Sequence, residues 1–134
     1  MRCAGLILYQ NRKTRDYSVE RYAGIYAVGN LIQLSAAEMA RDGVGLILRY
    51  LSEELPQGGV ERAPAFSREE ERAFHRRHRG VYVSVAPDGR INLGPLRRKG
   101  SGHVVDKDEV VHLPLSSTND EFMDALNLAL EAAD

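Results

Sequence analysis

Histidine is the residue type best suited to bind a metal ion or to move protons near neutral pH, and the chain has four histidines. His75 and His78 lie three residues apart in a helical pattern, with Glu71 one turn earlier, and this spacing can place metal ligands on one helix face. The pattern lacks the H-E-x-x-H arrangement of a zinc protease helix, and the neighbouring arginines would repel a cation. We therefore expect structural histidines and no metal site.

His103 and Asp106 could act as an acid and a base in phosphodiester cleavage. They follow a basic, glycine-containing segment, 97–103, which the sequence predicts to be a flexible loop, and mobile loops hold catalytic groups poorly. His112 lies in an apolar strand pattern and is expected to face the apolar residues as a structural histidine. Because no nucleophile with a positioned base can be identified, we predict no catalytic residues and no cofactor. A small hydrolase centred on His103 is a distant alternative.

The basic residues Arg97, Arg98 and Lys99 could hold phosphates if an aromatic strand residue such as Tyr82 lies beside them. The glycine-serine-glycine run that follows lacks the lysine and the helix start of a phosphate-binding loop. The chain has 18 basic and 19 acidic residues and a net charge of -1, so its overall charge favours neither nucleic acid nor an anionic membrane. An RNA-binding accessory domain that uses the 97–99 loop is the alternative prediction.

Acidic residues cluster at three places that are separate in the sequence from this basic loop. Small domains with segregated surface charge are often binding modules, because complementary charge speeds association and orients the partner. Aromatic side chains can supply the apolar centre of such a contact. The predicted partner-binding residues are Glu53, Glu54, Glu69, Glu70, Glu71, Phe74, Tyr82, Asp106, Asp108 and Glu109.

Length and composition predict one α+β domain over residues 1–134, since 43% of the residues are hydrophobic and 28% are charged. Cys3 is the one cysteine, so an intrachain disulfide is excluded and a reducing compartment fits. The apolar run near the first residue is too short for a signal peptide, and no stretch reaches the roughly 20 apolar residues of a membrane span. We expect a cytoplasmic protein.

The N-terminal half is predicted to hold strands and one helix. A buried strand at 5–10 and a half-exposed strand at 17–22 precede two short strands, 25–28 and 31–34. Ser35 and Glu38 form a capping-box pattern that starts a helix running to about Leu55. Gly43 and Gly45 each cost about 1 kcal/mol relative to alanine inside a helix. Either the helix packs very closely there or 44–48 is a strand, and we favour the helix.

A polar connection at 56–64 leads to a second, highly charged helix, which Ser67 and Glu70 are predicted to cap and Gly80 to end. Ala73 and Phe74 are its apolar residues, so the helix is expected to rest on the surface through Phe74.

The remaining chain is predicted to form a hairpin, one more strand and a final helix. Alternating valines at 81–85, the turn at 87–89 and the apolar residues at 91 and 93 indicate the hairpin. A strand at 109–115 follows, and Thr118 caps the final helix with Glu121. The fold prediction is a mostly antiparallel sheet of five to seven strands with three helices largely on one face. The two halves also suggest a weak internal pseudo-repeat.

Five segments carry a wider resemblance: the strand 79–85, the hairpin turn after it, the glycine-proline pair at 94–95, the strand 110–115 and the helix start 117–126. In this order they resemble the C-terminal region of the immunity proteins of bacterial contact-dependent growth inhibition systems. The resemblance implies a non-enzymatic cytosolic protein that binds the C-terminal toxin domain of a secreted effector, commonly over a nuclease active site. The predicted partner is a cognate toxin domain, a basic nuclease, with neither membrane nor direct nucleic acid as a partner. The family transfers no fixed interface residues, so the acidic and aromatic residues above are charge-based predictions.

Overall fold

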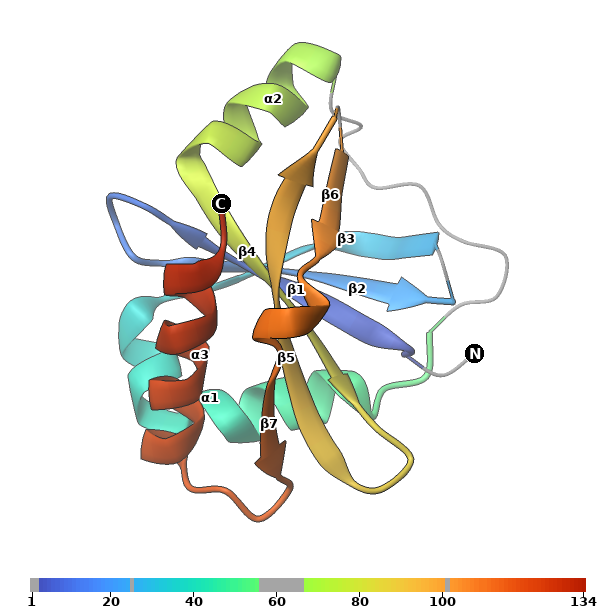
Figure 1. Cartoon of the computed structure of the whole chain (residues 1–134), viewed down its shortest axis with the longest axis vertical. Coiled ribbons are helices and arrows are strands. Elements are labelled where there is room, and N and C mark those ends of the chain that lie inside the picture. Colours follow the sequence, from blue (N-terminus) through green and yellow to red (C-terminus); the bar gives the residue numbers. More distant parts are fainter. Residues whose placement is uncertain (1–2, 25, 56–66, 101) are drawn as a thin grey trace.

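A computed structural model describes residues 3–24, 26–55, 67–100 and 102–134 (Figure 1). Within these ranges the chain forms an α+β fold with a seven-stranded antiparallel sheet and three α-helices, as predicted. The strands are β1 (Gly5–Asn11), β2 (Tyr17–Ala23), β3 (Tyr26–Leu34), β4 (His78–Val85), β5 (Arg90–Lys99), β6 (Gly102–Val105) and β7 (Val111–Pro114). The helices are α1 (Ala36–Leu51), α2 (Arg68–Arg77) and α3 (Asn119–Ala132), with a short 3-10 helix, η1 (Lys107–Glu109).

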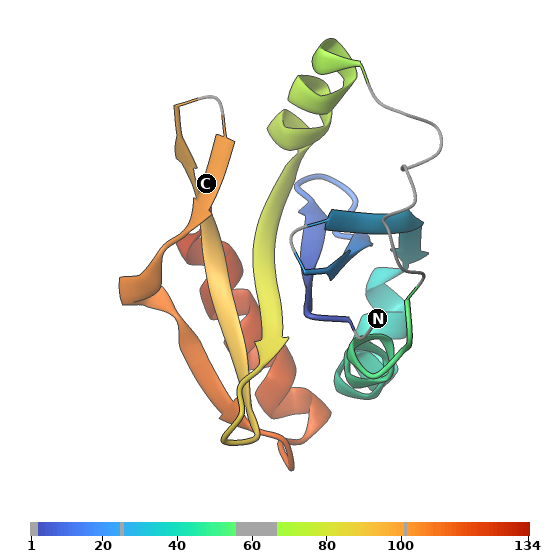
Figure 2. The same cartoon turned by 90° about the vertical axis from the view of Figure 1, so that its right-hand side faces the viewer.

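The strands lie in the order β3-β2-β1-β4-β5-β6, and β7 also pairs with β5. The long strand β5 pairs with β7 through its first half and with β6 through its second half. The sheet is curled, so that the β5–β6 hairpin and α2 stand side by side at one end of the molecule (Figure 2). This end holds the cleft described below.

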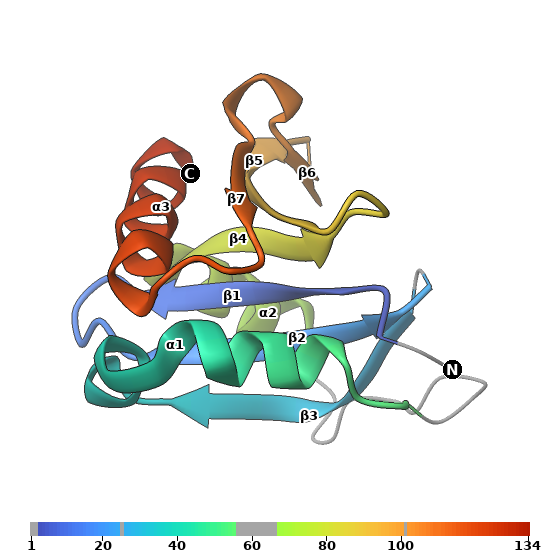
Figure 3. The ribbon, with the colours of Figure 1, turned by 90° about the horizontal axis from the view of Figure 1, so that it is seen from below.

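Two of the three helices lie on one face of the sheet, in agreement with the prediction (Figure 3). Helices α1 and α3 pack against each other and cover the apolar inner face. Helix α2 instead contacts an aromatic cluster on the opposite face. The largest fully buried side chains are Phe122, Leu6, Leu8, Met39, Ile47, Ile91, Leu93, Leu126, Leu130, Val19, Val81 and Val83.

All three predicted capping boxes are present. In each one the hydroxyl of the N-cap residue accepts a hydrogen bond from a backbone N–H three residues later, and the glutamate there accepts one from the N-cap backbone. These reciprocal bonds satisfy N–H groups that the first helical turn leaves without partners. The pairs are Ser35 with Glu38, Ser67 with Glu70, and Thr118 with Glu121.

Helix α1 confirms the helical prediction for 44–48, although it ends at Leu51 and not near residue 55. The helix is kinked at Asp42, whose backbone is non-helical (φ -155°, ψ 48°). The close packing expected at the glycines occurs at Gly43, where a Cβ would lie 3.2 Å from the sulfur of Met123 in α3. Glycine therefore allows the two helices to approach at the kink.

The side chain of Asn119 replaces backbone hydrogen bonds that the kink removes. Its Oδ1 accepts a hydrogen bond from the Val44 N–H at 2.8 Å, and its Nδ2 donates to the carbonyls of Met39 at 3.1 Å and Ala40 at 2.9 Å. One amide from α3 thus bridges both sides of the break in α1.

Two predictions for the N-terminal strands were wrong. The segments 25–28 and 31–34 are not separate strands, because β3 runs without interruption from Tyr26 to Leu34. A register shift takes up the glycine-asparagine pair at 29–30: Val19 pairs with Ile32, whereas Arg21 pairs with Val28. Strand β2 is also less exposed than predicted, since its first four residues are buried. The polar residues Ser18 and Glu20 are buried as well, and they form hydrogen bonds with Gln33 and with the hydroxyls of Tyr9 and Tyr22, respectively.

Three predictions for the C-terminal half also need correction. Gly80 does not end α2, which stops at Arg77 and passes directly into β4. Gly80 lies inside β4, where a Cβ would be 2.7 Å from the Leu96 side chain, so close packing explains this glycine. Of the basic segment, predicted to be a flexible loop, residues 97–99 belong to β5 and residues 102–103 to β6, and Arg98 pairs with His103. The strand predicted at 109–115 is shorter, because residue 109 belongs to η1.

The connection predicted at 56–64 lies outside the described residues. Among the helices that are described, none is long and apolar enough to cross a membrane. The pseudo-repeat stays a prediction; α1 is kinked at Asp42, whereas α3 is continuous through Asp124.

Candidate functional site

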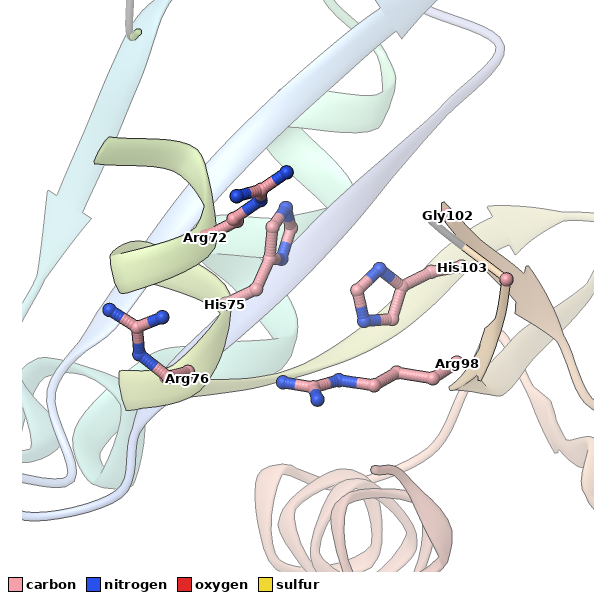
Figure 4. Close-up of a pocket in the computed structure, with 7 residues that line it drawn as sticks. Arg72, His75, Arg76, Arg98, Gly102 and His103 are labelled. Carbon is pink, nitrogen blue, oxygen red and sulfur yellow. The ribbon is translucent and has the colours of Figure 1, made fainter. Parts of the chain in front are cut away.

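The main candidate site is a cleft between α2 and the β5–β6 hairpin, over the outer face of the sheet. It consists of two adjoining hollows of about 350 Å³ and 560 Å³, which share Arg72, His75, Gly102 and His103. Figure 4 shows the side chains that line the first hollow. The second hollow adds Ile7, Tyr9, Tyr22, Leu96, Arg68 and Glu71. The cleft therefore combines an apolar and aromatic floor with cationic walls.

Aromatic contacts position α2 over the sheet. The Phe74 ring meets the Tyr9 ring edge-on, with centroids 4.9 Å apart, and stacks on the His78 ring at 3.9 Å. The Nδ1 atom of His78 forms a hydrogen bond with the Phe74 carbonyl at 2.7 Å. No residue of α2 is fully buried, so these contacts and the direct junction with β4 hold a helix that is otherwise exposed. The prediction that Phe74 rests this helix on the surface is confirmed.

The floor of the cleft is a small cluster of apolar and aromatic side chains, separate from the main core. Its buried members are Ile7, Tyr9 and Leu96, and Tyr22, Phe74, Tyr82 and Val105 pack against them. Glu20 lies beneath with only 4% of its surface exposed, and its Oε1 accepts hydrogen bonds from the hydroxyls of Tyr9 and Tyr22. Burial raises the pKa of Tyr22 far above its usual range, so this hydroxyl stays a hydrogen-bond donor.

Two histidines face each other across the cleft, His75 from α2 and His103 from β6 (Figure 4). Their ring centroids are 4.7 Å apart. Burial lowers the pKa of His103, the nearby Arg98 guanidinium lowers it further, and Asp134 acts in the opposite direction. His103 is therefore predominantly neutral at pH 7.

The residues after α3 brace the hairpin. The guanidinium of Arg97 donates to the Ala132 carbonyl at 2.8 Å and pairs with the carboxylates of Asp106 at 3.3 Å and Asp134 at 3.4 Å. The Asp134 carboxylate also accepts a hydrogen bond from the Arg98 backbone N–H at 2.7 Å. The Arg98 side chain extends toward α2 (Figure 4). The two arginines of the basic segment therefore differ. Arg97 forms hydrogen bonds and ion pairs within the chain, and Arg98 lines the cleft.

The acid–base pair considered from the sequence is not assembled. Asp106 pairs through Oδ2 with Arg97, while its Oδ1 accepts a hydrogen bond from the Asp108 N–H. His103 meets His75 instead. Within 3–24, 26–55, 67–100 and 102–134, no three His, Cys, Asp or Glu side chains gather as a metal site. His78 stacks on the Phe74 ring, whereas His75 meets that ring edge-on and also contacts His103.

His112 is exposed, contrary to the expectation that it faces apolar residues. The alternation of strand β7 turns Val111 and Leu113 toward the core and His112 to the outside. Its Nδ1 forms a hydrogen bond with Asn92 Oδ1 at 2.6 Å across the strand pair. Cys3 is buried, and burial raises the pKa of its thiol, which disfavours the thiolate.

The structure brings together some of the predicted partner-binding residues and separates the rest. Phe74 and Tyr82 both pack against the aromatic cluster, and Glu71 lines the cleft. The others are Glu69 and Glu70 at the start of α2, Glu53 and Glu54 after α1, and Asp106, Asp108 and Glu109 at η1. These three places lie apart in Figures 1 and 2. Two acids also pair with arginines, Glu53 with Arg21 and Asp106 with Arg97, so acidic and basic groups are less segregated than the sequence indicated.

Sequence reasoning missed the arginines of α2 as site residues. Arg68, Arg72 and Arg76 are spaced by four, which places them on one side of a helix. This spacing was a usable signal for a basic stripe. Its meeting with Arg98, across the cleft, depends on the tertiary structure.

Comparison with known proteins adds evidence at the level of the fold. No family model matches the chain, and no curated protein matches its sequence. Solved structures do match. One is a chain of a CdiA-CT/CdiI toxin and immunity complex from Yersinia pseudotuberculosis, with a TM-score of 0.61 and 16% identity, covering 100% of this chain and 99% of that one. Another is a protein of unknown function from Neisseria meningitidis, with a TM-score of 0.62 and 13% identity, covering 100% and 98%. At such identities the likeness establishes a shared fold, that of a chain from a toxin–immunity complex.

Proposed function

We propose that this chain is an immunity protein that binds and neutralises a cognate contact-dependent growth inhibition toxin domain by direct, non-catalytic contact. The observation that carries the proposal is the full-length likeness to a chain of a toxin and immunity complex. The sequence resemblance of the segments between residues 79 and 126 points the same way. In this role the protein acts in the cytosol of the producing cell and its siblings.

The histidine environment supports a binding role over a catalytic one. The Asp106 carboxylate, which would have to serve His103, is held by Arg97 and by the backbone of η1. The rings of His75 and His103 instead line a cleft with an aromatic floor. A concave surface with aromatic residues at its base is the kind of site in which a partner side chain can be buried.

The proposed toxin is a basic nuclease. The exposed acidic groups at the start of α2 and around η1 support this, because they would attract a basic protein before contact. Phe74 and Tyr82, which pack against the same buried cluster, supply the proposed apolar centre of the contact. Such an arrangement combines fast capture with slow release.

Coexpression tests the proposal. The toxin-like C-terminal domain encoded immediately upstream of this chain is expressed with it, without it, and with an immunity protein of a different system. We expect growth to be restored by this chain alone and the two proteins to copurify as a stable complex. If the upstream domain is toxic and this chain neither binds it nor restores growth, the proposal fails for that pair.

RNA binding is the second candidate, and one observation favours it: Arg98 lies with Arg72 and Arg76 on the walls of the cleft. A protein that neutralises several phosphates loses RNA affinity steeply as salt rises. Titration of a fluorescent single-stranded RNA at 50 and 200 mM salt distinguishes the two functions. Submicromolar binding at 200 mM salt by the free chain would favour RNA over a toxin.

A further inference from the structure

The arginines of the cleft form two opposed walls. Arg68, Arg72 and Arg76 lie on one side of α2, and Arg98 reaches toward them from the end of β5 (Figure 4). All four side chains are exposed. The arginines of α2 belong to a helix with a capping box. Arg98 belongs to a hairpin whose backbone N–H at Arg98 donates a hydrogen bond to the Asp134 carboxylate. The positive charges are thus mounted on braced elements and are well placed to bind an anion.

These charges are not neutralised within the described part of the chain. Arg72, Arg76 and Arg98 form no salt bridge with any carboxylate there, whereas the neighbouring Arg97 pairs with Asp106 and Asp134. Two adjacent residues of one strand therefore have opposite roles. The side chain of Arg97 stabilises the hairpin, and that of Arg98 is directed into the cleft.

Acidic residues limit the kind of anion that can enter. Glu71 lines the cleft, Glu69 and Glu70 precede it on α2, and Asp134 lies beside Arg98. The whole chain carries a net charge of -1. A nucleic acid strand carries many charges over a length greater than the Debye length of about 8 Å at physiological salt, so it would be repelled by these neighbours. A short segment with one or two carboxylates can contact the arginines without extending over these acidic residues.

The cleft is also sized and lined for protein side chains. Of its two hollows, the one of about 560 Å³ is lined by the buried side chains of Ile7, Tyr9 and Leu96, and it adjoins the hollow of about 350 Å³ that Arg76 and Arg98 line. Arginine binds carboxylates through paired, charge-assisted hydrogen bonds. A segment with an acidic side chain for the arginines and an apolar side chain for the buried apolar residues would therefore match both parts of the cleft.

We propose that the cleft between α2 and the β5–β6 hairpin receives a short acidic segment of the toxin domain. Its Asp or Glu carboxylates bind Arg72 and Arg98, and an adjacent apolar side chain packs on Tyr9 and Leu96. This inference rests on the proposed function and adds to it the surface that binds and the chemistry of the segment that is bound. The partner is basic overall but docks through a locally acidic element.

The test compares two double charge reversals in the full chain. Arg72→Glu with Arg98→Glu alters the cleft, and Arg41→Glu with Arg90→Glu alters two exposed arginines outside it. Affinity for the upstream toxin domain is measured by calorimetry at 150 mM salt, after circular dichroism shows that both variants are folded. We expect about a 100-fold weaker complex for the cleft variant and a change of less than about threefold for the control.

A reciprocal change identifies the acidic segment. Acidic residues of the toxin domain are replaced by lysine one at a time, and we expect one such variant to bind the cleft variant at least tenfold more tightly than the unchanged toxin does. Equal binding of toxin by the wild-type chain and the cleft variant would overturn this inference and leave the proposed function standing. If the wild-type chain does not bind toxin at all, both fail. RNA binding by the wild-type chain that the cleft variant loses would also overturn it, in favour of a phosphate site.

Discussion

The two faces of the sheet are built on different principles. On the inner face, α1 and α3 bury large apolar side chains such as Phe122, Leu126 and Ile47 completely. On the outer face, α2 has no fully buried residue and rests mainly through one aromatic ring, leaving a cleft with cationic walls. Stability scales with the apolar area removed from water, so the inner face holds the fold together. The outer face keeps charged groups at the surface, where they can act on a partner.

This division predicts that single substitutions affect either folding or binding, according to the face on which they lie. The strongest test is on the inner face, where a lost methyl group leaves a cavity. Weaker effects are expected at the junction of the helices, on the outer face and in the titration of the histidines.

The largest expected effect is that of Leu126→Ala. Leu126 is 0% exposed, so its truncation should lower the free energy of unfolding by about 2–5 kcal/mol. Leu128 lies two residues away in the same helix but is 61% exposed, and Leu128→Ala should change stability by less than about 0.5 kcal/mol. Urea denaturation measures both. Similar losses in the two variants would show that α3 does not bury the face described here.

A smaller loss is expected for Asn119→Ala, which removes the amide that bridges the kink in α1. Leaving these backbone groups without partners should cost about 1–3 kcal/mol. The matched control is Asn127→Ala, at an exposed position of the same helix, and it should be close to neutral. Thermal unfolding of both variants checks the difference. If Asn119→Ala is as stable as the control, the Asn119 hydrogen bonds do not stabilise the kinked helix.

On the outer face, Phe74→Ala should loosen α2 without unfolding the core. Loss of the contacts with Tyr9 and His78 should make local opening of α2 easier by about 1–2 kcal/mol. Hydrogen exchange measured by mass spectrometry should therefore speed up in α2 and stay unchanged in α3. Faster exchange in α3 would mean that the two faces are coupled and do not contribute separately to folding and binding.

The smallest effect concerns pH. Burial lowers the pKa values of His78 and His103 below the usual 6.5. As pH falls through 6.5, the unfolded chain binds protons before the folded one does, so these two histidines make the fold less stable on acidification. NMR titration should give both residues pKa values under 6.5, and His103→Gln should weaken the loss of melting temperature between pH 7.5 and 5.5. A His103 pKa above 6.5 would contradict this and would mean that the Asp134 carboxylate outweighs burial and the Arg98 charge.

Patterns that depend on neighbouring residues were predictable from the sequence. The three capping boxes, the hairpin around the turn at 87–89 and the apolar stripe of α3 were all predicted, because each involves residues within a few positions of one another. The errors occur where distant segments meet. Gly80 resembled a helix end, but it lies in a strand because Leu96 packs over it. The basic segment resembled a loop, but contacts with Asp134 hold it as a hairpin.

The candidate site follows the same rule. The sequence identified Phe74, Tyr82 and Glu71 as contact residues, and the cleft or its floor includes all three. It could not indicate that Glu53 pairs with Arg21 and Asp106 with Arg97. It also missed Arg72 and Arg76 as site residues, because a charged helix face alone does not indicate a cleft, and Arg98 on the opposite side is placed only by the tertiary structure.

By itself, the amino-acid sequence determined the three helix starts, the hairpin around the turn at 87–89, the α+β class and the apolar face of α3, because capping, turns and periodicity are local properties of the chain. Tertiary structure alone decided which charges are neutralised and which line a cleft. Arg97 and Arg98 are neighbours with the same side chain, yet one pairs with Asp106 and Asp134 and the other lines the cleft opposite Arg72. Alternation along β5 turns them to different surroundings, and only the folding of α2 and of the residues after α3 around that strand gives those surroundings opposite charge.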